Sequence, residues 1–421
     1  MSGSPRLWAG LVLALLIAAT VVVAVTLVPW HAAPAPRADQ LAALRAMPSG
    51  PVARGRAFHA ALRPPLYGSA IVGLVVALVL GLTPLGARIV AACGRPFGGN
   101  WIAEAVLGGL AVVFLGSLPT LPFGAWQHVV LRRYGLSTQG WRGWTVDLLK
   151  SYAIGAVLAA VALLGLYAVA RATPRWWWAW GAAGAAALVV LMSFVFPVLV
   201  EPVFNRFTPM PPGPLRDDLV ALAARDGVPV RDVLVADASR RTNALNAYVS
   251  GFGATRRIVV YDTLLRDADP AEVRSVVAHE LGHAKDRDVV TGTTVGALGA
   301  ASAVIAVYLL GSWTGLLRRA GIDAIGQPRS IALLLALAAV AGVLATPAQN
   351  LVSRRIESRA DIHALALTRD PQTFAAMQQR LALVNLSDVD PNPVEYLLLF
   401  THPSTVQRIA AARAWGREHR R

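Results

Sequence analysis

The pentad His279-Glu280-Leu281-Gly282-His283 has the residue types and the spacing of a hydrolytic metal site. On a helix, two imidazoles four residues apart lie on one face and can bind the same metal ion. The carboxylate of Glu280 stands beside the first imidazole, where it can polarise a water molecule at that metal. The pattern therefore predicts zinc-assisted hydrolysis, with His279 and His283 as metal ligands and Glu280 as the catalytic carboxylate.

A short pattern of this kind also arises by chance, so a third ligand has to support it. Hydrolytic zinc usually has three protein ligands and keeps a fourth position for water. Glutamate is rare in this chain, and Glu357, within Ser353–Asp361, is the best candidate. Asp361 shares its helix face and could accept the free N–H of a ligating histidine. Two alternatives remain open: Glu357 could pair with a neighbouring arginine at the surface, and Asp361 could be merely solvated. The single cysteine, Cys93, excludes a cysteine-based zinc site.

The elements that must position these residues are mostly apolar. Hydrophobic residues make up 55% of the 421-residue chain and charged residues only 15%, whereas soluble domains average about 25% charged. Seven apolar runs are long enough to cross a bilayer, which predicts an integral, multi-pass membrane protein. These runs are approximately Leu7–Val28, Leu66–Val90, Trp101–Phe123, Tyr152–Val169, Trp177–Val200, Val289–Trp313 and Ile331–Pro347.

The first apolar run has a second interpretation. Arg6 precedes it and small residues follow near Ala32-Ala33, as in a cleaved signal peptide. The run is longer than the usual apolar region of such a peptide, so we favour a retained helix.

The basic character of the chain is best explained by membrane topology. Its net charge of +15 does not indicate nucleic-acid binding, because the arginines are scattered over loops and helix ends. Arginine is modestly enriched in the loops on the side that carries the pentad. This bias predicts that the pentad faces the cytoplasm.

Soluble patterning returns between about residues 201 and 288. An amphipathic helix is expected at Pro214–Asp226, short strands at 233–235 and Arg257–Tyr261, and an edge strand at Asn246–Ser250. The pentad lies on a helix that begins at Pro270, with Asp269 as its N-cap. A second soluble segment, 354–421, continues out of the seventh run and ends in a basic helix at Val406–Arg421.

We accordingly divide the chain into four segments. Residues 1–200 hold membrane helices one to five, 201–288 the soluble segment with the pentad, 289–350 helices six and seven, and 351–421 a C-terminal helical segment that completes the zinc site. The pentad helix runs almost directly into the sixth span at Val289, and Glu357 follows the seventh span closely. A metal held by both would lie at or just below the membrane surface, where membrane-associated substrates reach it most readily.

The chain resembles the integral-membrane zinc metalloproteases that include the type I CAAX prenyl proteases and the bacterial heat-shock membrane proteases. His279–His283 matches the HExxH of that family, and Ser353–Asp361 is similar to its SRxxExxAD segment. Seven spans favour the prenyl-protease branch. Further similar segments lie along nearly the whole chain, at Tyr134–Thr138, Pro202–Phe207, Asn246–Tyr248, Arg257–Leu265, Thr401–Pro403 and Arg408-Ile409.

The resemblance implies an all-α multi-span membrane protein, whose about seven transmembrane helices enclose a chamber, with a small α+β zinc metalloprotease domain. It gives His279, His283 and Glu357 as ligands of one Zn²⁺ per chain and Glu280 as the catalytic carboxylate. His402 and Arg408 fall where the family places groups that contact substrate or the transition state. Asn246 and Ala247 fall on the strand that pairs with the substrate backbone. His402 has an alternative role as a cap of the helix that follows it.

The chain departs from the family pattern at two positions. Asp288 stands where prenyl-protease relatives often carry another histidine, and Ser404 replaces a proline. Neither residue is expected to touch a metal ligand. Together these two departures favour a bacterial branch of the family, located in a bacterial cell membrane. They also argue against prenylated substrates.

The predicted function is a membrane-embedded zinc endopeptidase that cuts membrane-associated proteins or peptides. Quality control of misfolded membrane proteins is an alternative to CAAX-type processing. An inactive membrane scaffold is disfavoured because such a protein is expected to have a broken ligand set, and all four central residues are present. A zinc transporter is disfavoured because the apolar runs carry almost no ionisable residues.

Overall fold

The computed structural model describes residues 4–31, 34–251 and 253–419. Within these ranges seven helices are long and apolar enough to cross a membrane, which confirms the seven predicted runs. The candidate spans are Pro5–Leu27 (α1), Ser49–Leu82 (α3), Trp101–Arg133 (α5 to α7), Trp141–Ala172 (α8), Trp177–Phe204 (α9 to α10), Asp288–Leu310 (α14) and Pro328–Thr368 (η7 and α16).

Shorter elements connect and extend these spans. Two spans contain π-helical turns, η2 at Glu104–Gly108 and η4 at Phe196–Val200. Outside the spans the α-helices are α2 (Arg37–Arg45), α4 (Pro84–Gly94), α11 (Pro214–Arg225), α12 (Asp262–Asp267), α13 (Pro270–Lys285), α15 (Thr314–Ala320), α17 (Pro371–Val384), α18 (Pro393–Leu399) and α19 (Thr405–Glu418). Within the third and fifth spans, α5 covers Trp101–Ala103, α6 Gly109–Ser117, α7 Leu121–Arg133, α9 Trp177–Val195 and α10 Glu201–Phe204; α16 covers Ile331–Thr368.

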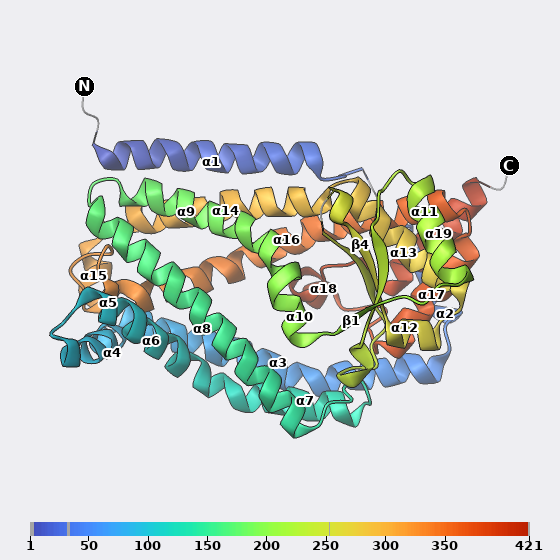
Figure 1. Cartoon of the computed structure of the whole chain (residues 1–421), viewed down its shortest axis with the longest axis horizontal. Helices are drawn as coiled ribbons and strands as arrows, with labels where there is room; N and C mark the ends of the chain where they lie inside the picture. The colour runs from blue at the N-terminus through green and yellow to red at the C-terminus, as the bar shows by residue number, and fades with distance from the viewer. Residues whose placement is uncertain (1–3, 32–33, 252, 420–421) are drawn as a thin grey trace.

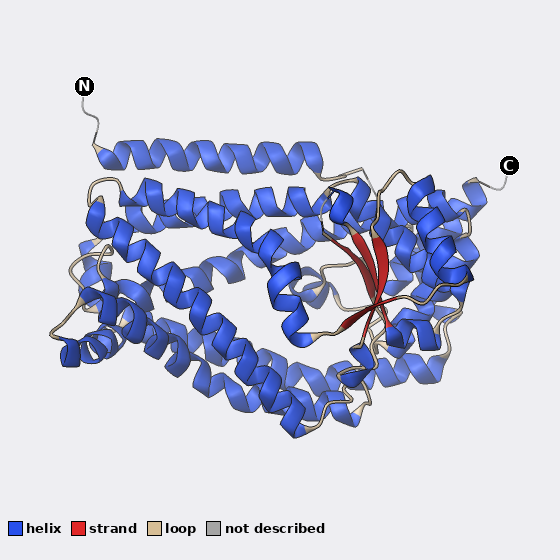
Figure 2. Cartoon of the chain, viewed as in Figure 1, coloured by secondary structure: helices blue, strands red, loops and turns tan. Residues whose placement is uncertain are grey.

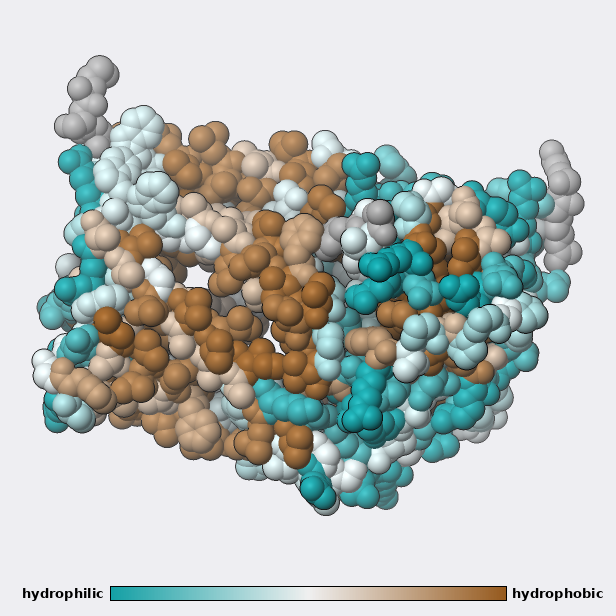
Figure 3. Space-filling view, in the orientation of Figure 1, coloured by the Kyte–Doolittle hydropathy of each residue, from teal (hydrophilic) through white to brown (hydrophobic). Residues whose placement is uncertain are grey.

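Most of the length of the long helices lies at one end of the molecule (Figures 1 and 2). The other end is a small domain formed by the β-sheet, α11, α12, α13, α17, α19 and the C-terminal part of α16. Helices α3, α8, α9 and α16 diverge around an open centre, and the space-filling view is hollowed between them (Figure 3). Apolar side chains cover this end, whereas the end with the sheet, α17 and α19 is mostly hydrophilic (Figure 3). Large apolar side chains exposed on α1, α3, α8 and α9 suit contact with lipid. The chain is a multi-pass membrane protein.

The second predicted run, Leu66–Val90, has the wrong boundaries. Its helix begins earlier, at Ser49, and ends at Leu82. Thr83 is extended, with φ −128° and ψ 164°, because the following Pro84 disfavours a helical conformation at the residue before it. The Thr83 hydroxyl then accepts a hydrogen bond from the backbone N–H of Leu85 and caps α4.

Among the described residues, the small domain contains a four-stranded sheet with the order β1-β2-β4-β3. The strands are Phe207–Pro209, Asp232–Ala236, Ala247–Ser250 and Arg257–Tyr261, numbered β1 to β4 in chain order. Strands β2 and β4 are parallel, whereas β1 and β3 pair antiparallel with their neighbours. The predicted edge strand β3 is confirmed. Strand β1 was not expected from the sequence, because three residues are too few to show alternation.

The small domain is built around α13, which packs against both the sheet and α16. Its buried core includes Leu219 and Leu222 from α11, Ile258 and Val260 from β4, and Leu281 from the pentad. Helix α13 begins at Pro270, as predicted, with a capping box between Asp269 and Glu272.

Two continuous connections tie this domain to the spans. Helix α13 ends at Lys285 and α14 begins at Asp288, with Arg287 between them in the left-handed conformation at φ 57°. Helix α16 extends without a break through the seventh span and into the small domain, as predicted. It is this helix that carries Glu357 and Asp361.

Candidate metal centre

The side chains of His279, His283 and Glu357 converge on one point. Each offers a ligand atom, and these atoms lie within 4.8 Å of one another. The two histidine Nε2 atoms are 3.1 Å apart. Glu357 approaches with Oε2 at 3.2 Å from Nε2 of His279 and Oε1 at 3.5 Å from Nε2 of His283. Helices α13 and α16 therefore bring two nitrogen donors and one oxygen donor together, a set that suits a metal ion.

A carboxylate holds the second nitrogen of each imidazole. Asp361 Oδ1 lies 2.9 Å from His279 Nδ1, and Asp288 Oδ2 lies 2.8 Å from His283 Nδ1. A hydrogen bond donated by Nδ1–H to each carboxylate leaves the lone pair of Nε2 directed at the common point. The donor set therefore fits a metal ion in both its chemistry and its orientation.

The expectation that Asp288 touches no metal ligand is wrong. Because only Asp286 and the left-handed Arg287 separate α13 from α14, the first residue of α14 folds back onto the last turn of α13. Asp288 is buried there and also forms an ion pair with Arg359, whose Nε lies 2.8 Å from Asp286. Sequence reasoning missed this contact, although an acid five residues after His283 is a signal that it could have used.

The charge around His279 depends on these carboxylates. Burial alone would lower the pKa of His279, but hydrogen bonds with Asp361 and Glu357 outweigh it and raise the pKa to about 10. The metal-free imidazole of His279 is therefore protonated on both nitrogens, and positively charged, at neutral pH. Burial also raises the pKa of the Glu280 carboxyl, while His279 and His283 act in the opposite direction.

Arg408 contacts Asp361, the carboxylate that holds His279. It forms an ion pair with that carboxylate, with Nε at 2.8 Å from Oδ2, and its Nη2 lies 3.4 Å from His279 Nδ1. The geometry gives Arg408 a contact that the sequence did not predict, on a residue next to a candidate ligand. Arg408 also lines the cleft in front of the centre.

His402 approaches Glu357 from the loop between α18 and α19. Its Nε2 lies 3.4 Å from Glu357 Oε1, and its Nδ1 lies 2.8 Å from the Thr401 hydroxyl. The alternative that His402 caps the following helix is wrong, because Ser404 is the N-cap of α19 and forms a capping box with Gln407. Ser404 contacts Gln407 and the backbone N–H of Arg408 within the first turn of α19.

A cleft lies on each side of Glu280. One, of about 370 Å³, is lined by Asn246, His279, Glu280, His402 and Arg408 together with further polar and apolar residues. The other, of about 340 Å³, is lined by Val249, Gly251, Glu280, His283 and Glu357. Strand β3 runs from the first cleft toward the second, and it pairs with β4 alone among the described strands. Its Ala247 side chain is buried in the core, so the strand offers its backbone edge.

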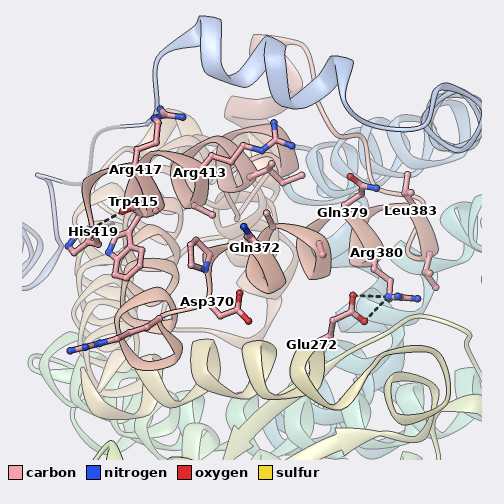
Figure 4. A pocket seen from close by; sticks show the side chains of 18 residues that line it. Glu272, Asp370, Gln372, Gln379, Arg380, Leu383, Arg413, Trp415, Arg417 and His419 are labelled. Carbon is pink, nitrogen blue, oxygen red and sulfur yellow. Dashed lines mark hydrogen bonds and ion pairs between the residues drawn. The ribbon is translucent and has the colours of Figure 1, made fainter. Parts of the chain in front are cut away.

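A further cleft, larger than these two, lies apart from this centre. It has a volume of about 1260 Å³ and lies between α17 and α19, on a face where Arg380 pairs with Glu272 (Figure 4). None of the predicted site residues lines it.

Known proteins resemble both the membrane helices and the domain that carries the candidate metal centre. The family model described as peptidase family M48 matches residues 212–416, and the one described as CAAX prenyl protease N-terminal, five membrane helices, matches residues 67–206. An uncharacterized metalloprotease of Bacillus subtilis (strain 168), YhfN, is 31% identical over 74% of this chain and 76% of its own length. The chain belongs to peptidase family M48.

Other relatives of this M48 peptidase agree with that assignment. A CAAX prenyl protease 1 homolog of Oryza sativa subsp. japonica is 31% identical over 71% of both chains. The crystal structure of S. mikatae Ste24p superposes with a TM-score of 0.75 at 20% identity and covers 96% of this chain and 98% of its own. That likeness shows a common fold. The chain is thus a membrane metalloprotease, a hydrolase that depends on a metal ion.

Proposed function

We propose that this M48 peptidase is a zinc endopeptidase that hydrolyses peptide bonds of membrane-associated proteins or peptides, with one zinc per chain. The convergence of His279, His283 and Glu357, with each imidazole oriented by a carboxylate, carries the proposal. Two nitrogens and one carboxylate form a common ligand set of catalytic zinc, which leaves a position for water and substrate. Zinc, when bound, supplies a Lewis acid that polarises a carbonyl oxygen and makes water more acidic.

In this mechanism Glu280 moves the proton. It lines both clefts and is the first residue after a proposed ligand, so it stands beside the point where water and substrate meet. Its carboxylate takes a proton from the attacking water and later delivers it to the leaving amine.

His402 stabilises the charge that develops on the carbonyl oxygen. The Thr401 hydroxyl donates to Nδ1 in this scheme, so Nε2 carries the proton and points toward the centre. Desolvation at the wall of the cleft lowers the pKa of His402, which favours the neutral imidazole. An Nε2–H donor at that place can hydrogen-bond an oxyanion as it forms.

Asp361 and Arg408 hold His279 in position. The buried Asp361 accepts from both residues, so its charge is balanced by Arg408 while it orients the imidazole. We propose that Arg408 acts mainly through this carboxylate.

The substrate binds as an added strand on the free edge of β3. This places an extended backbone beside Asn246 and Ala247 and leads it from one cleft past Glu280 to the other. Main-chain hydrogen bonds position the scissile bond without demanding one particular side chain.

The catalytic unit combines residues 201–288 with 351–421, and it lies at the cytoplasmic face of a bacterial cell membrane. The arginine bias of the loops supports this orientation. The direct connections of α13 to α14 and of the seventh span to Glu357 support a centre close to the bilayer, where membrane-associated chains reach it.

Quality control of misfolded membrane proteins is a second proposal, because recognition through the backbone also suits unfolded segments. Cleavage of a prenylated peptide and of an unfolded membrane protein should be compared with the same purified enzyme. Faster cleavage of the prenylated peptide would overturn the second proposal, and faster cleavage of the unfolded protein would support it.

The ligand set is tested by metal content. The purified protein should hold about one zinc per chain, and Glu357→Ala should lower that occupancy. Unchanged occupancy in the variant would remove Glu357 from the ligand set. The variant Arg380→Ala, in the separate cleft between α17 and α19 (Figure 4), should retain the metal and serves as a control.

A further inference from the structure

Helix α16 holds the loop that carries His402, through three hydrogen bonds to backbone carbonyls. One nitrogen of Arg354, Nη1, donates to the carbonyl oxygens of Tyr396, at 2.9 Å, and Phe400, at 2.6 Å. Asn350 Nδ2 donates to the carbonyl oxygen of Leu397 at 3.0 Å. The guanidinium of Arg354 also lies over the Tyr396 ring, 4.4 Å from its centroid. Arg354 and Asn350 are both buried.

These contacts satisfy groups that α18 cannot satisfy itself. The last carbonyls of a helix lack partners within the helix, and α18 has only seven residues. Its outer side chains do not anchor it by burial, since Val394 and Leu397–Leu399 are exposed. Its other end is held by α3, where Arg63 Nε lies 2.5 Å from Glu395. At the end nearest His402, Arg354 and Asn350 bond the backbone carbonyls and the Tyr396 hydroxyl donates to Gln407, but only Arg354 reaches the Phe400 carbonyl among the hydrogen bonds of the described residues.

The same stretch of α16 carries the proposed metal ligand. Asn350, Arg354, Glu357 and Asp361 are spaced by four, three and four residues, so they follow one face of the helix. Phe400 precedes His402 by two residues, which limits the backbone path between the clamped carbonyl and His402 to about 7 Å. One rigid helix thus fixes Glu357 and, through Arg354, the backbone just before His402.

We propose that Arg354 is a positioning residue that sets the place of His402 relative to the metal centre, with Asn350 in support. The inference rests on the proposed role of His402 in stabilising the oxyanion. Without the guanidinium, the carbonyl of Phe400 loses its buried donor and the His402 loop relaxes away from Glu357. A donor displaced by about 1 Å can cost on the order of 100-fold in rate.

Steady-state proteolysis by Arg354→Ala, His402→Ala and the double variant tests this proposal. Arg354→Ala should lower kcat about 10- to 100-fold and leave KM within about threefold, since the β3 edge is untouched. The double variant should be no slower than His402→Ala, because Arg354 acts through His402. Arg354→Lys should recover most of the activity, since an ammonium can still donate to the Phe400 carbonyl.

Arg380→Ala controls for the general loss of an arginine that ties two elements together. Arg380 likewise donates to a backbone carbonyl, that of Asp267 at 2.9 Å, but it lines the separate cleft between α17 and α19 (Figure 4). The kcat of Arg380→Ala should stay within about twofold of the parent value. Zinc content and thermal unfolding of every variant show whether it is folded. If Arg354→Ala does not fold, Asn350→Ala should give the same non-additivity with His402→Ala at a smaller amplitude.

The proposal is overturned if Arg354→Ala keeps the parent kcat, or if its loss multiplies with that of His402→Ala. Either result could occur in an enzyme that still requires Glu280 and zinc, so it would not touch the proposed function. Proteolysis that survives Glu280→Gln would instead refute the proposed function itself.

Discussion

Asp288 should contribute measurably to metal affinity although it is not a ligand. Its Oδ2 accepts from His283 Nδ1 at 2.8 Å in a buried position, so it fixes the imidazole and increases its basicity. Removing such a partner typically costs 10- to 100-fold in metal affinity, which corresponds to about 1.4–2.7 kcal/mol at about 1.36 kcal/mol per tenfold. Asp288→Asn keeps an acceptor oxygen but loses the charge, so it should lie near the lower figure. Asp288→Ala loses both and should lie near the upper one.

The assay is a zinc titration of the metal-free enzyme against a chelator of known affinity. Asp286→Asn is the matched control, because Asp286 contacts the same arginine, Arg359, but has no contact with a proposed ligand. Its Kd for zinc should stay within about twofold of the parent. The reasoning is refuted if Asp288→Ala binds zinc as tightly as the parent, or if Asp286→Asn weakens binding as much as Asp288→Ala does.

Two further predictions concern the same centre. In Gly282→Ala a new Cβ would lie 3.1 Å from Cδ2 and 3.2 Å from Cβ of His363, whose ring is held by Asp226. Overpacking should cost about 1–3 kcal/mol, of which the helix propensity of alanine offsets about 1 kcal/mol. Thermal unfolding should show a lower Tm, partly restored by adding His363→Ala, and a raised Tm would contradict the packing. Zinc binding at pH 8 should release about one proton, because the raised pKa of about 10 keeps metal-free His279 protonated until the pH passes that value. Calorimetry in two buffers of different ionisation enthalpy measures this release. The apparent zinc affinity should therefore fall as the pH falls below 10, and an affinity that is flat between pH 7 and 9 would be incompatible with it.

Features that depend on local patterns could be predicted from the sequence. Long apolar runs located the membrane spans, and Asp269-Pro270 located the start of α13. The run of β-branched and aromatic residues in Arg257–Tyr261 located β4. Helical spacing placed the two histidines on one face, and the continuous α16 brings Glu357 to them.

Features that depend on tertiary contacts could not be predicted in this way. The contact of Asp288 with His283 requires the left-handed turn at Arg287, which nothing in the side chain of an arginine demands. The hydrogen bond from Arg354 to the Phe400 carbonyl joins residues that are 46 positions apart in the chain. The pairing of Arg408 with Asp361 likewise spans 47 positions, and no periodicity reports such contacts.

The most direct test of the whole account is the proteolytic rate of Glu280→Gln in the purified, zinc-loaded protein. Glutamine has nearly the same shape but cannot accept the proton of water, so zinc content should remain at about one per chain. Cleavage should fall by about 100- to 10,000-fold. A variant that holds its zinc and cleaves at the parent rate would contradict the account.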